Sequence, residues 1–399
     1  MKAFLIAGEP SGDLLGGALL AGLQELAPGL QLAGVGGPAM AARGLDSLFP
    51  MSDLTLMGLA EVLPHLPKLF RRRDEAVRAI RAWRPDLLIT IDSPDFTLRV
   101  TAAARAARPD LPTVHYVAPT VWAWRPGRAT KMARTIDHVL ALLPFEPPYM
   151  EAAGMSCDFV GHPVVEAPVP DRAAAAAFRA AHGIAADAPL VVVLPGSRGS
   201  EVKRLLPVFG AALPPIAAAL PDLRVVVPAA GPVADAVTAA AAAWPGAPVL
   251  LDPRGRPDAA AEKRAAFAAA DVAMAASGTV TLELAATATP HVIAYDAAWL
   301  TRQIAQRMLL TRRVNLVNLL TDSDSIPERT GAGCRADLIA ADILTLLREP
   351  QARAAQTAAM AQSMTALGRG GPPPGRRAAQ SVLRFLDRSG REAEAAHSR

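Results

Sequence analysis

Residues 190–203 read LVVVLPGSRGSEVK, and this stretch decides the fold class. Its first five residues are apolar without polar alternation, which is typical of a strand buried on both faces of a parallel sheet. A Pro-Gly pair ends the strand, and a helical pattern follows Glu201. A strand that turns on glycine into a helix directs free backbone N–H groups at one point, which suits a phosphate. A plain turn with Ser197 as the helix cap and Arg198 in solvent fits the local pattern equally well.

Composition limits the classes of protein to consider. The 399 residues suffice for two domains, and 51% hydrophobic with 20% charged residues indicates a globular chain. A net charge of +4 is too small to indicate a nucleic-acid partner. Two cysteines and scattered histidines predict neither a disulfide framework nor a metal site. The start, MKAFLIAGEPSGD, favours a first strand over a signal peptide, and prolines interrupt the apolar residues 225–251. Any membrane contact should therefore be peripheral.

The strand-turn-helix unit recurs along the chain. Buried strands are predicted at 3–7, 32–37, 85–91, 113–117, 138–143 and 158–163, and again, after the Pro-rich residues 163–170, at 190–194, 223–227, 248–251, 270–275 and 291–295. This pattern predicts two Rossmann-like, doubly wound α/β domains, residues 1–165 and 166–367, that face a cleft. Residues 368–399 should form a C-terminal helix with a mobile tail. This helix could pack back on the N-terminal domain.

Polar residues follow several predicted strands at the edge where ligands bind in open α/β sheets. Asp92 comes directly after residues 85–91 and could take a proton from a bound hydroxyl, or could form an Asx-turn. The GEPSGD loop of residues 8–13 either lines a site or caps its helix. Residues 277–279, Ser-Gly-Thr, repeat the form of the 196–198 loop, so the two loops could grip a diphosphate. Glu283, one turn later, could reach ribose hydroxyls.

Residues 57–83 combine an apolar stripe at helical spacing with a basic cluster. This composition suits a helix on an anionic membrane surface, although a helix packed on its own sheet with solvated arginines has the same pattern. Pro64 and Pro67 should kink or split the helix. Trp122 and Trp124 either stack on a sugar or pack between layers.

Ten segments together resemble the lipid-A-disaccharide synthase family over residues 1 to about 320. They are SGDLLGG, GVGGPAM, MGLAEVL, IDSPDF, HYVAPTVWAWRPGR, LLPFE, FVGHP, LPGSRGSE, SGTVTLE and VNLVNLL, in this order. The combination of IDSPDF with HYVAPTVWAWRPGR is specific. The chain departs from the family pattern at Val317, where proline is usual, and it lacks the common Gln after Glu328.

The resemblance implies an inverting glycosyltransferase of the two-domain GT-B type that needs no metal or other cofactor. Such enzymes join UDP-2,3-diacylglucosamine to 2,3-diacylglucosamine 1-phosphate, known as lipid X, and release lipid A disaccharide 1-phosphate and UDP. They work in the cytoplasm as peripheral proteins on the inner face of the bacterial inner membrane. For residues 57–83, the acylated substrates favour the membrane interpretation.

The resemblance also assigns roles to residues. Asp92 would be the general base, and Arg198 would hold the leaving diphosphate where other enzymes use a metal ion. The nucleotide would contact Gly196, Ser197, Arg198, Glu201, Ser277, Gly278, Thr279, Glu283 and Asn318. The acceptor side would comprise Glu9, Ser11, Gly12, Asp13, Trp122 and Trp124. Membrane contact would involve Leu59, Val62, Leu63, Leu66, Leu69, Phe70, Arg71, Arg72 and Arg73.

Two other functions fit the sequence. One is a second type of enzyme with the same fold, either a UDP-sugar epimerase or a transferase with a different lipid acceptor. The other is a nucleotide-sugar binding module without turnover. Release of UDP that depends on an acylated acceptor distinguishes the family reaction from both the epimerase and the binding module.

Overall fold

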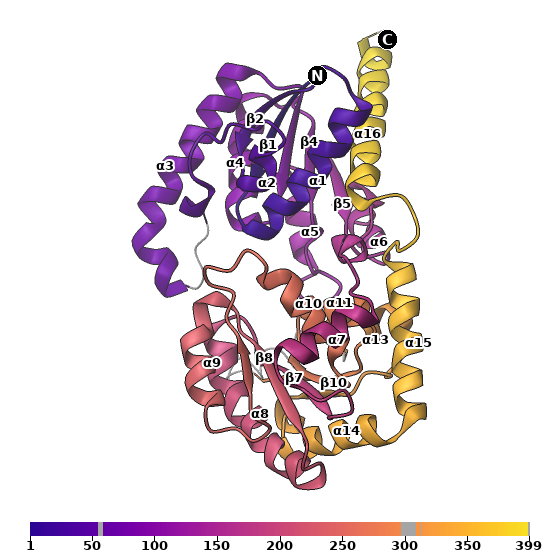
Figure 1. Ribbon diagram of the computed structural model, residues 1–399. Coiled ribbons are helices and arrows are strands. Elements are labelled where there is room, and N and C mark those ends of the chain that lie inside the picture. Colours follow the sequence, from indigo (N-terminus) through magenta and orange to yellow (C-terminus); the bar gives the residue numbers. More distant parts are fainter. Residues whose placement is uncertain (55–58, 297–308, 312, 398–399) are drawn as a thin grey trace. The chain divides into compact units, whose positions relative to one another are not determined.

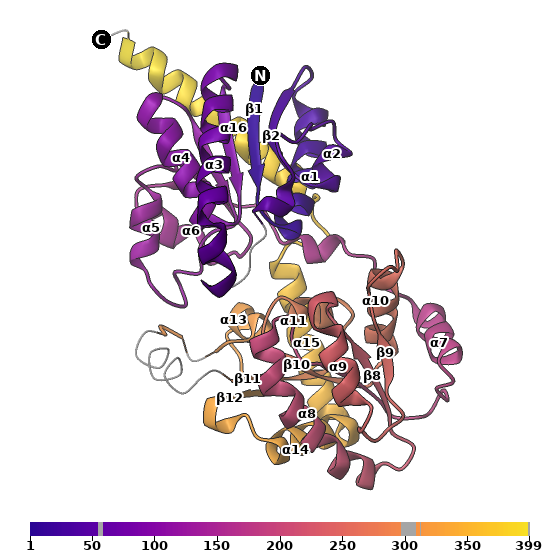
Figure 2. The same cartoon turned by 90° about the vertical axis from the view of Figure 1, so that its left-hand side faces the viewer.

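The computed structural model describes residues 1–54, 59–296, 309–311 and 313–397, without the side chains of residues 59–65 and 392–397 (Figures 1 and 2). The chain divides into two compact units. The first unit comprises Met1–Pro163 and Gly370–Arg399, and the second comprises Val164–Arg369. The boundaries expected from the sequence, at 165 and 367, lie beside these. Each unit contains one parallel six-stranded sheet, so the predicted fold class of two Rossmann-like domains is confirmed.

The sheet of the first unit has the strand order β2-β1-β3-β4-β5-β6. Its strands are β1 (Lys2–Ala7), β2 (Gln31–Val35), β3 (Leu87–Ile91), β4 (Thr113–Tyr116), β5 (His138–Ala141) and β6 (Ser156–Phe159). All neighbours pair in parallel. The chain order reverses between β1 and β3, because β2 lies outside β1. The loops after β1 and β3 therefore diverge at this point and leave a crevice where ligands bind in such sheets.

Helices cover both faces of this sheet, which is why its central strands are apolar throughout. On one face, α1 (Pro10–Leu26) and α16 (Pro374–His397) share a core with alternate strand residues such as Leu5 and Ile89. On the other face, α3 (Leu59–Trp83) and α4 (Pro94–Ala107) pack on the intervening residues, such as Phe4 and Leu88. The remaining helices of this unit are short: α2 (Pro38–Ala41), η1 (Met51–Asp53), α5 (Gly127–Met132) and α6 (Pro147–Glu151).

The sheet of the second unit has the order β12-β11-β10-β7-β8-β9, and its chain order reverses between β7 and β10. Its strands are β7 (Leu190–Leu194), β8 (Arg224–Pro228), β9 (Val249–Leu251), β10 (Val272–Ala276), β11 (His291–Tyr295) and β12 (Glu328–Thr330). Ten of the eleven predicted strands coincide with observed ones, whereas the strand predicted at 158–163 overlaps β6 only at residues 158 and 159. The sequence analysis missed β12, because three residues, two of them charged, give no apolar run.

The helices of the second unit and the linking turn complete the fold. They are η2 (Pro163–Glu166), α7 (Arg172–Ala181), α8 (Gly199–Ala219), η3 (Gly231–Val233), α9 (Ala234–Ala241), α10 (Ala259–Ala269), α11 (Val280–Ala286), α13 (Leu316–Thr321), η4 (Gly331–Gly333), α14 (Ala336–Arg348) and α15 (Pro350–Ala366). Among the described residues, only α8 is long and apolar enough to cross a membrane. Its residues Leu205, Phe209 and Leu213 are buried in the core of the second unit, so α8 is a core helix of this unit.

Helix α3 runs without interruption for 25 residues. Of the predicted kink or split at Pro64 and Pro67, the split is therefore wrong. A proline removes one backbone donor and crowds the preceding turn. Tertiary contacts offset that cost here, since Ala76 and Ile80 of α3 are buried against the sheet and Asp53 forms salt bridges with Lys68 and Arg72.

Helix α16 returns to the first unit and packs on α1. Glycines allow this close approach, because a Cβ at Gly375 would lie 2.5 Å from the Ala18 carbonyl oxygen. The imidazole of His138 on β5 is buried between two hydroxyl groups. Its Nδ1 lies 2.8 Å from Ser156 Oγ and its Nε2 lies 2.8 Å from Ser381 Oγ on α16. These polar contacts fix the C-terminal helix to the sheet.

Candidate functional site

The first candidate site lies at the crevice between β1 and β3 of the first unit. Asp92 and Ser93 follow β3 with φ angles of 52° and 45°, in the left-handed region that non-glycine residues rarely adopt. Such backbone strain is characteristic of functional turns. Gly8, after β1, makes the tight turn possible, because a Cβ there would lie 2.5 Å from Ser93 Oγ. Gly8 and Ser93 therefore lie in direct contact where the two loops begin.

The carboxylate of Asp92 is half-buried, and only one of its two oxygens accepts a hydrogen bond from the described residues. Its Oδ1 accepts the backbone N–H of Ser93 at 2.8 Å. No donor among the described residues reaches Oδ2, and the side chain of Asp92 does not cap α4. Asp92 therefore does not cap α4 through the Asx-turn that the sequence also allowed. One carboxylate oxygen is fixed in the turn, and the other is available to accept a proton.

A cavity of about 270 Å³ adjoins Asp92. Glu9 also lines it, with Oε1 3.5 Å from Ser93 Oγ. The opposite lining comes from α3 and α4 and combines apolar with basic side chains: Leu66, Leu69, Phe70, Phe96, Arg73 and Arg99. The cavity thus brings a carboxylate base, an apolar surface and two guanidinium groups together.

The other residues of the GEPSGD loop have different surroundings. Ser11 is exposed and Gly12 is buried. Asp13 is buried, and its two oxygens accept three backbone N–H groups of the turn into α2, at 2.8 Å from Gly37, 2.8 Å from Ala39 and 3.0 Å from Met40. Asp13 therefore holds the loop after β2 in place.

The segment after β4 carries the two tryptophans. Trp122 packs edge-on against Phe145 and donates its indole N–H to Glu146 at 3.3 Å. The guanidinium of Arg125 lies 4.4 Å from the ring centroid of the more exposed Trp124. Sequence reasoning missed Glu146, which is buried and also accepts the backbone N–H groups of residues 142 and 143. Burial raises the pKa of Glu146 to about 7.

The residues of α3 that were predicted to contact the membrane differ in their exposure to solvent. The side chains of Leu59, Val62 and Leu63 lie outside the described residues. Leu66 and Leu69 are half-buried, while Phe70 is 41% exposed and Arg71 is exposed. Arg72 is bound by Asp53 and Glu75 at 2.7 and 2.6 Å, so its charge is already compensated within the protein.

The second candidate site lies at the crevice between β7 and β10 of the second unit. Gly196 turns the chain with a φ of 110°. The backbone N–H groups of Ser197 and Arg198 point at Glu201 Oε2, over long distances of 3.3 and 3.4 Å. Arg198 Nη1 lies 2.9 Å from Glu201 Oε1, and the Arg198 side chain is 66% exposed. The backbone N–H groups and the guanidinium that the sequence analysis expected to bind a phosphate therefore contact the Glu201 carboxylate.

The loop after β10 lies on the neighbouring strand. Ser277 Oγ donates to the carbonyl oxygen of Val314 at 3.1 Å. Gly278 and Thr279 are exposed. Glu283 in α11 forms an ion pair with Lys263 at 2.6 Å. The two loops that the sequence paired thus occupy adjacent strands of one sheet.

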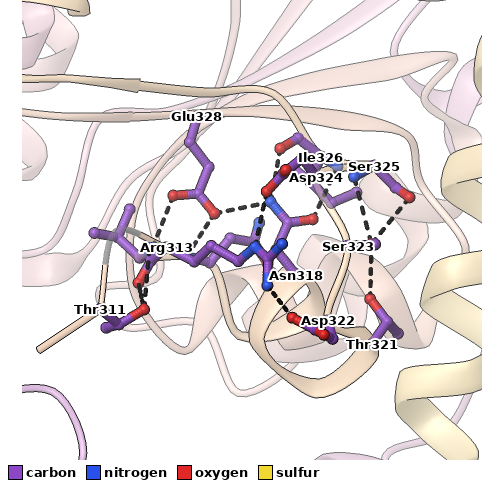
Figure 3. Close-up of polar contacts among 12 residues, drawn as sticks. Thr311, Arg313, Asn318, Thr321, Asp322, Ser323, Asp324, Ser325, Ile326 and Glu328 are labelled. Carbon is purple, nitrogen blue, oxygen red and sulfur yellow. Dashed lines mark hydrogen bonds and ion pairs between the residues drawn. The ribbon is translucent and has the colours of Figure 1, made fainter.

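Asn318 is buried in the short helix α13 (Figure 3). Its amide donates to the Ile326 carbonyl and to Glu328 Oε1, both at 2.8 Å, and its Oδ1 accepts the Ile326 N–H at 3.0 Å. Glu328 also accepts the backbone N–H groups of Val314 and Asn315. Sequence reasoning missed Glu328 as the centre of this network. Asn318 therefore positions Val314 and, through it, Ser277.

The residue after Glu328 is Arg329, the first of the segment RTGAGC that lacks the family's common Gln. Its guanidinium forms two bonds of 2.6 Å with Asp342 of α14. Within the described ranges, no group of three or more His, Cys, Asp or Glu side chains is arranged to hold a metal ion.

Comparison with known proteins identifies the family. The sequence profile described as Lipid-A-disaccharide synthetase matches residues 3–372. The chain is 59% identical to the lipid-A-disaccharide synthase of Ruegeria pomeroyi, over 96% of this chain and 95% of that protein. It is 50% identical to the enzyme of the same name from Rhodospirillum centenum, over 96% and 94% of the two chains.

Among solved structures, the chain is similar to the UDP-GlcNAc 2-epimerase of Neisseria meningitidis bound to UDP-GlcNAc. The TM-score is 0.65 with 10% identity, over 97% of this chain and 100% of that chain. At this identity the likeness concerns the fold alone, which is of the GT-B class. The profile match over nearly the whole chain and the high identity to named relatives decide the family. The chain belongs to the lipid-A-disaccharide synthase family of glycosyltransferases, which act in lipid A biosynthesis.

Proposed function

We propose that this protein transfers diacylglucosamine from a UDP-linked donor to lipid X, giving lipid A disaccharide 1-phosphate and UDP. The observation that carries the proposal is the half-free carboxylate of Asp92 beside a cavity with an apolar wall. A hydroxyl nucleophile needs a base, and an acylated substrate needs an apolar surface. Family membership supports the same reaction.

Asp92 acts as the general base. Its Oδ2 accepts the proton of the acceptor hydroxyl while that oxygen attacks the anomeric carbon of the donor. The new C–O bond forms as the bond from the anomeric carbon to the diphosphate breaks, and UDP leaves with the electron pair. Attack from the face opposite UDP inverts the configuration, so no second nucleophilic carboxylate is required.

The loops after β7 and β10 hold the UDP. Two features support this assignment: both loops adjoin the point where the strand order reverses, and the first directs two N–H groups and a guanidinium at a carboxylate. A diphosphate carries more negative charge than the Glu201 carboxylate and would replace it on the same donors. Arg198 then stabilises the negative charge that develops on the leaving group. Glu283 and the 277–279 loop contact the nucleoside.

Helix α3 places the protein on the inner face of the inner membrane as a peripheral protein. Support comes from Phe70, which is 41% exposed, beside the exposed Arg71. An apolar ring next to a cation suits the boundary between lipid headgroups and acyl chains. Both substrates are acylated, so the active site has to work at this boundary.

Replacing Asp92 by Asn should abolish transfer and retain UDP affinity. The amide cannot accept the proton but keeps the size and the turn, so kcat should fall by roughly 100- to 10,000-fold. A coupled assay of UDP release with acylated and unacylated acceptors measures the change. Asp110→Asn, at an exposed position of the same unit, is the matched control. Normal turnover by Asp92→Asn would contradict the base assignment, and UDP release without acceptor would contradict the transferase.

Replacing Arg198 by Ala should weaken UDP binding about tenfold or more, because a charge-assisted hydrogen bond contributes about 1.5–3 kcal/mol. Isothermal titration with UDP measures the dissociation constant directly. Arg204→Ala removes an exposed guanidinium of the same helix, α8, and should leave UDP binding unchanged. Equal affinities of the Arg198 and Arg204 variants would rule out the proposed contact.

Replacing Phe70 by Asp should release the protein from vesicles that contain anionic lipid. The substitution removes exposed apolar area and introduces a charge of the same sign as the lipid headgroups. Co-sedimentation measures bound protein, and circular dichroism checks the fold. Val169→Asp, at an apolar position of the second unit that is 53% exposed, serves as the control. Undiminished sedimentation of the Phe70 variant would count against membrane contact through α3.

A further inference from the structure

The cavity beside Asp92 has a cationic side formed by Arg73, which the sequence assigned to membrane contact, and by Arg99, which has had no role so far. Arg73 comes from α3 and Arg99 from α4. The apolar side chains of Leu66, Leu69 and Phe70 line the same cavity. The helices that carry the two arginines are separate in sequence, so their convergence on one cavity follows only from the fold.

Arg99 is available to a ligand. Its side chain is exposed, and no hydrogen bond or ion pair joins it to any other residue in the part of the chain that the structure describes. Arg73 is only weakly held. Its guanidinium bonds to Asp74, a half-exposed neighbour in the chain, and lies 5.1 Å from the ring centroid of Phe70. Such a surface pair contributes little free energy and exchanges readily for a stronger anion.

The adjacent Arg72, by contrast, has its guanidinium fully engaged in contacts within the protein. It binds Asp53 and Glu75 at 2.7 and 2.6 Å and lies over the ring of Phe49. The two arginines of the cavity have no comparable set of partners among the described residues. Their guanidinium groups therefore keep the donors that bind phosphate in a bidentate manner.

The acidic groups of the cavity determine where an anion can bind. Glu9 and Asp92 lie at the sheet edge, and Asp95 lies in the first turn of α4. These carboxylates repel a phosphate from the edge where the hydroxyl must react. Arg99 lies five positions after Pro94, which corresponds to a rise of roughly 7 Å along the helix. Arg99 therefore lies more than one helical turn from the end of α4 that adjoins Asp92.

We propose that Arg99 and Arg73 bind the phosphate monoester of the acceptor, while Leu66, Leu69 and Phe70 contact its acyl chain. This inference rests on the proposed function, since it assigns the acceptor to the same cavity as Asp92. A sugar held by its phosphate at the arginines presents a hydroxyl to Asp92. The arginines are thus specificity-determining residues that select a phosphorylated acceptor over one without phosphate.

The test compares Arg99→Ala, Arg73→Ala and the control Arg78→Ala on two acceptors, lipid X and the same acylated glucosamine without its phosphate. Arg78 is exposed on α3 and does not line the cavity. For lipid X, Arg99→Ala should raise the KM at least tenfold and leave the KM of the UDP-linked donor unchanged. For the acceptor without phosphate, kcat/KM should change less than twofold. Arg99→Lys should restore part of the affinity for lipid X.

Equal losses on the two acceptors, or no loss on lipid X, would overturn the phosphate site. Titration of lipid X in mixed micelles without donor separates this result from a failure of the proposed function. Binding that weakens in Arg99→Ala but not in Arg78→Ala supports the site even if the wild type shows no turnover. Turnover by the wild type with identical binding by both variants leaves the transferase intact and refutes the phosphate site.

Discussion

The reversal of strand order in each parallel sheet is the constraint on which the rest of the structure depends. In the first unit it separates the loops after β1 and β3, and in the second it separates the loops after β7 and β10. Because both strands at each crevice are buried by helices, only their carboxyl ends are free to carry polar chemistry. Asp92 stands at one crevice and Arg198 at the other. Under the proposed function, the base and the leaving-group site therefore lie in different units.

Two buried carboxylates and one half-buried carboxylate keep these loops in shape. Asp13 holds the turn into α2, Glu146 holds the turn after β5 together with Trp122, and Glu328 holds the segment that includes Val314. Each accepts backbone N–H groups that would otherwise be buried without partners, which is costly. Asp92 differs because one of its oxygens has no donor among the described residues. The contrast separates carboxylates that shape the site from the one that is free to react.

Apolar runs in the sequence were sufficient to predict ten of the twelve strands in the described sheets, because a buried parallel strand leaves a continuous hydrophobic signal. The partly polar β6 was placed too late in the chain. The short, polar β12 leaves no such signal. Side-chain roles were harder to predict. The sequence does not distinguish an Asn318 that is buried in its own segment from one that faces a ligand. A carboxylate such as Glu328 is not marked by any characteristic spacing in the sequence. Arg99 was missed because its cavity forms only when α3 and α4 pack side by side.

The central claim is that each unit binds one substrate at its own crevice. Hydrogen–deuterium exchange of the full chain, measured with UDP alone and with lipid X alone, tests it most directly. UDP should slow exchange in residues 196–201 and 277–283 and leave residues 66–73 and 92–99 unchanged, whereas lipid X should do the reverse. Protection of the first unit by UDP, or of the 196–201 loop by lipid X alone, would contradict this assignment of the substrates.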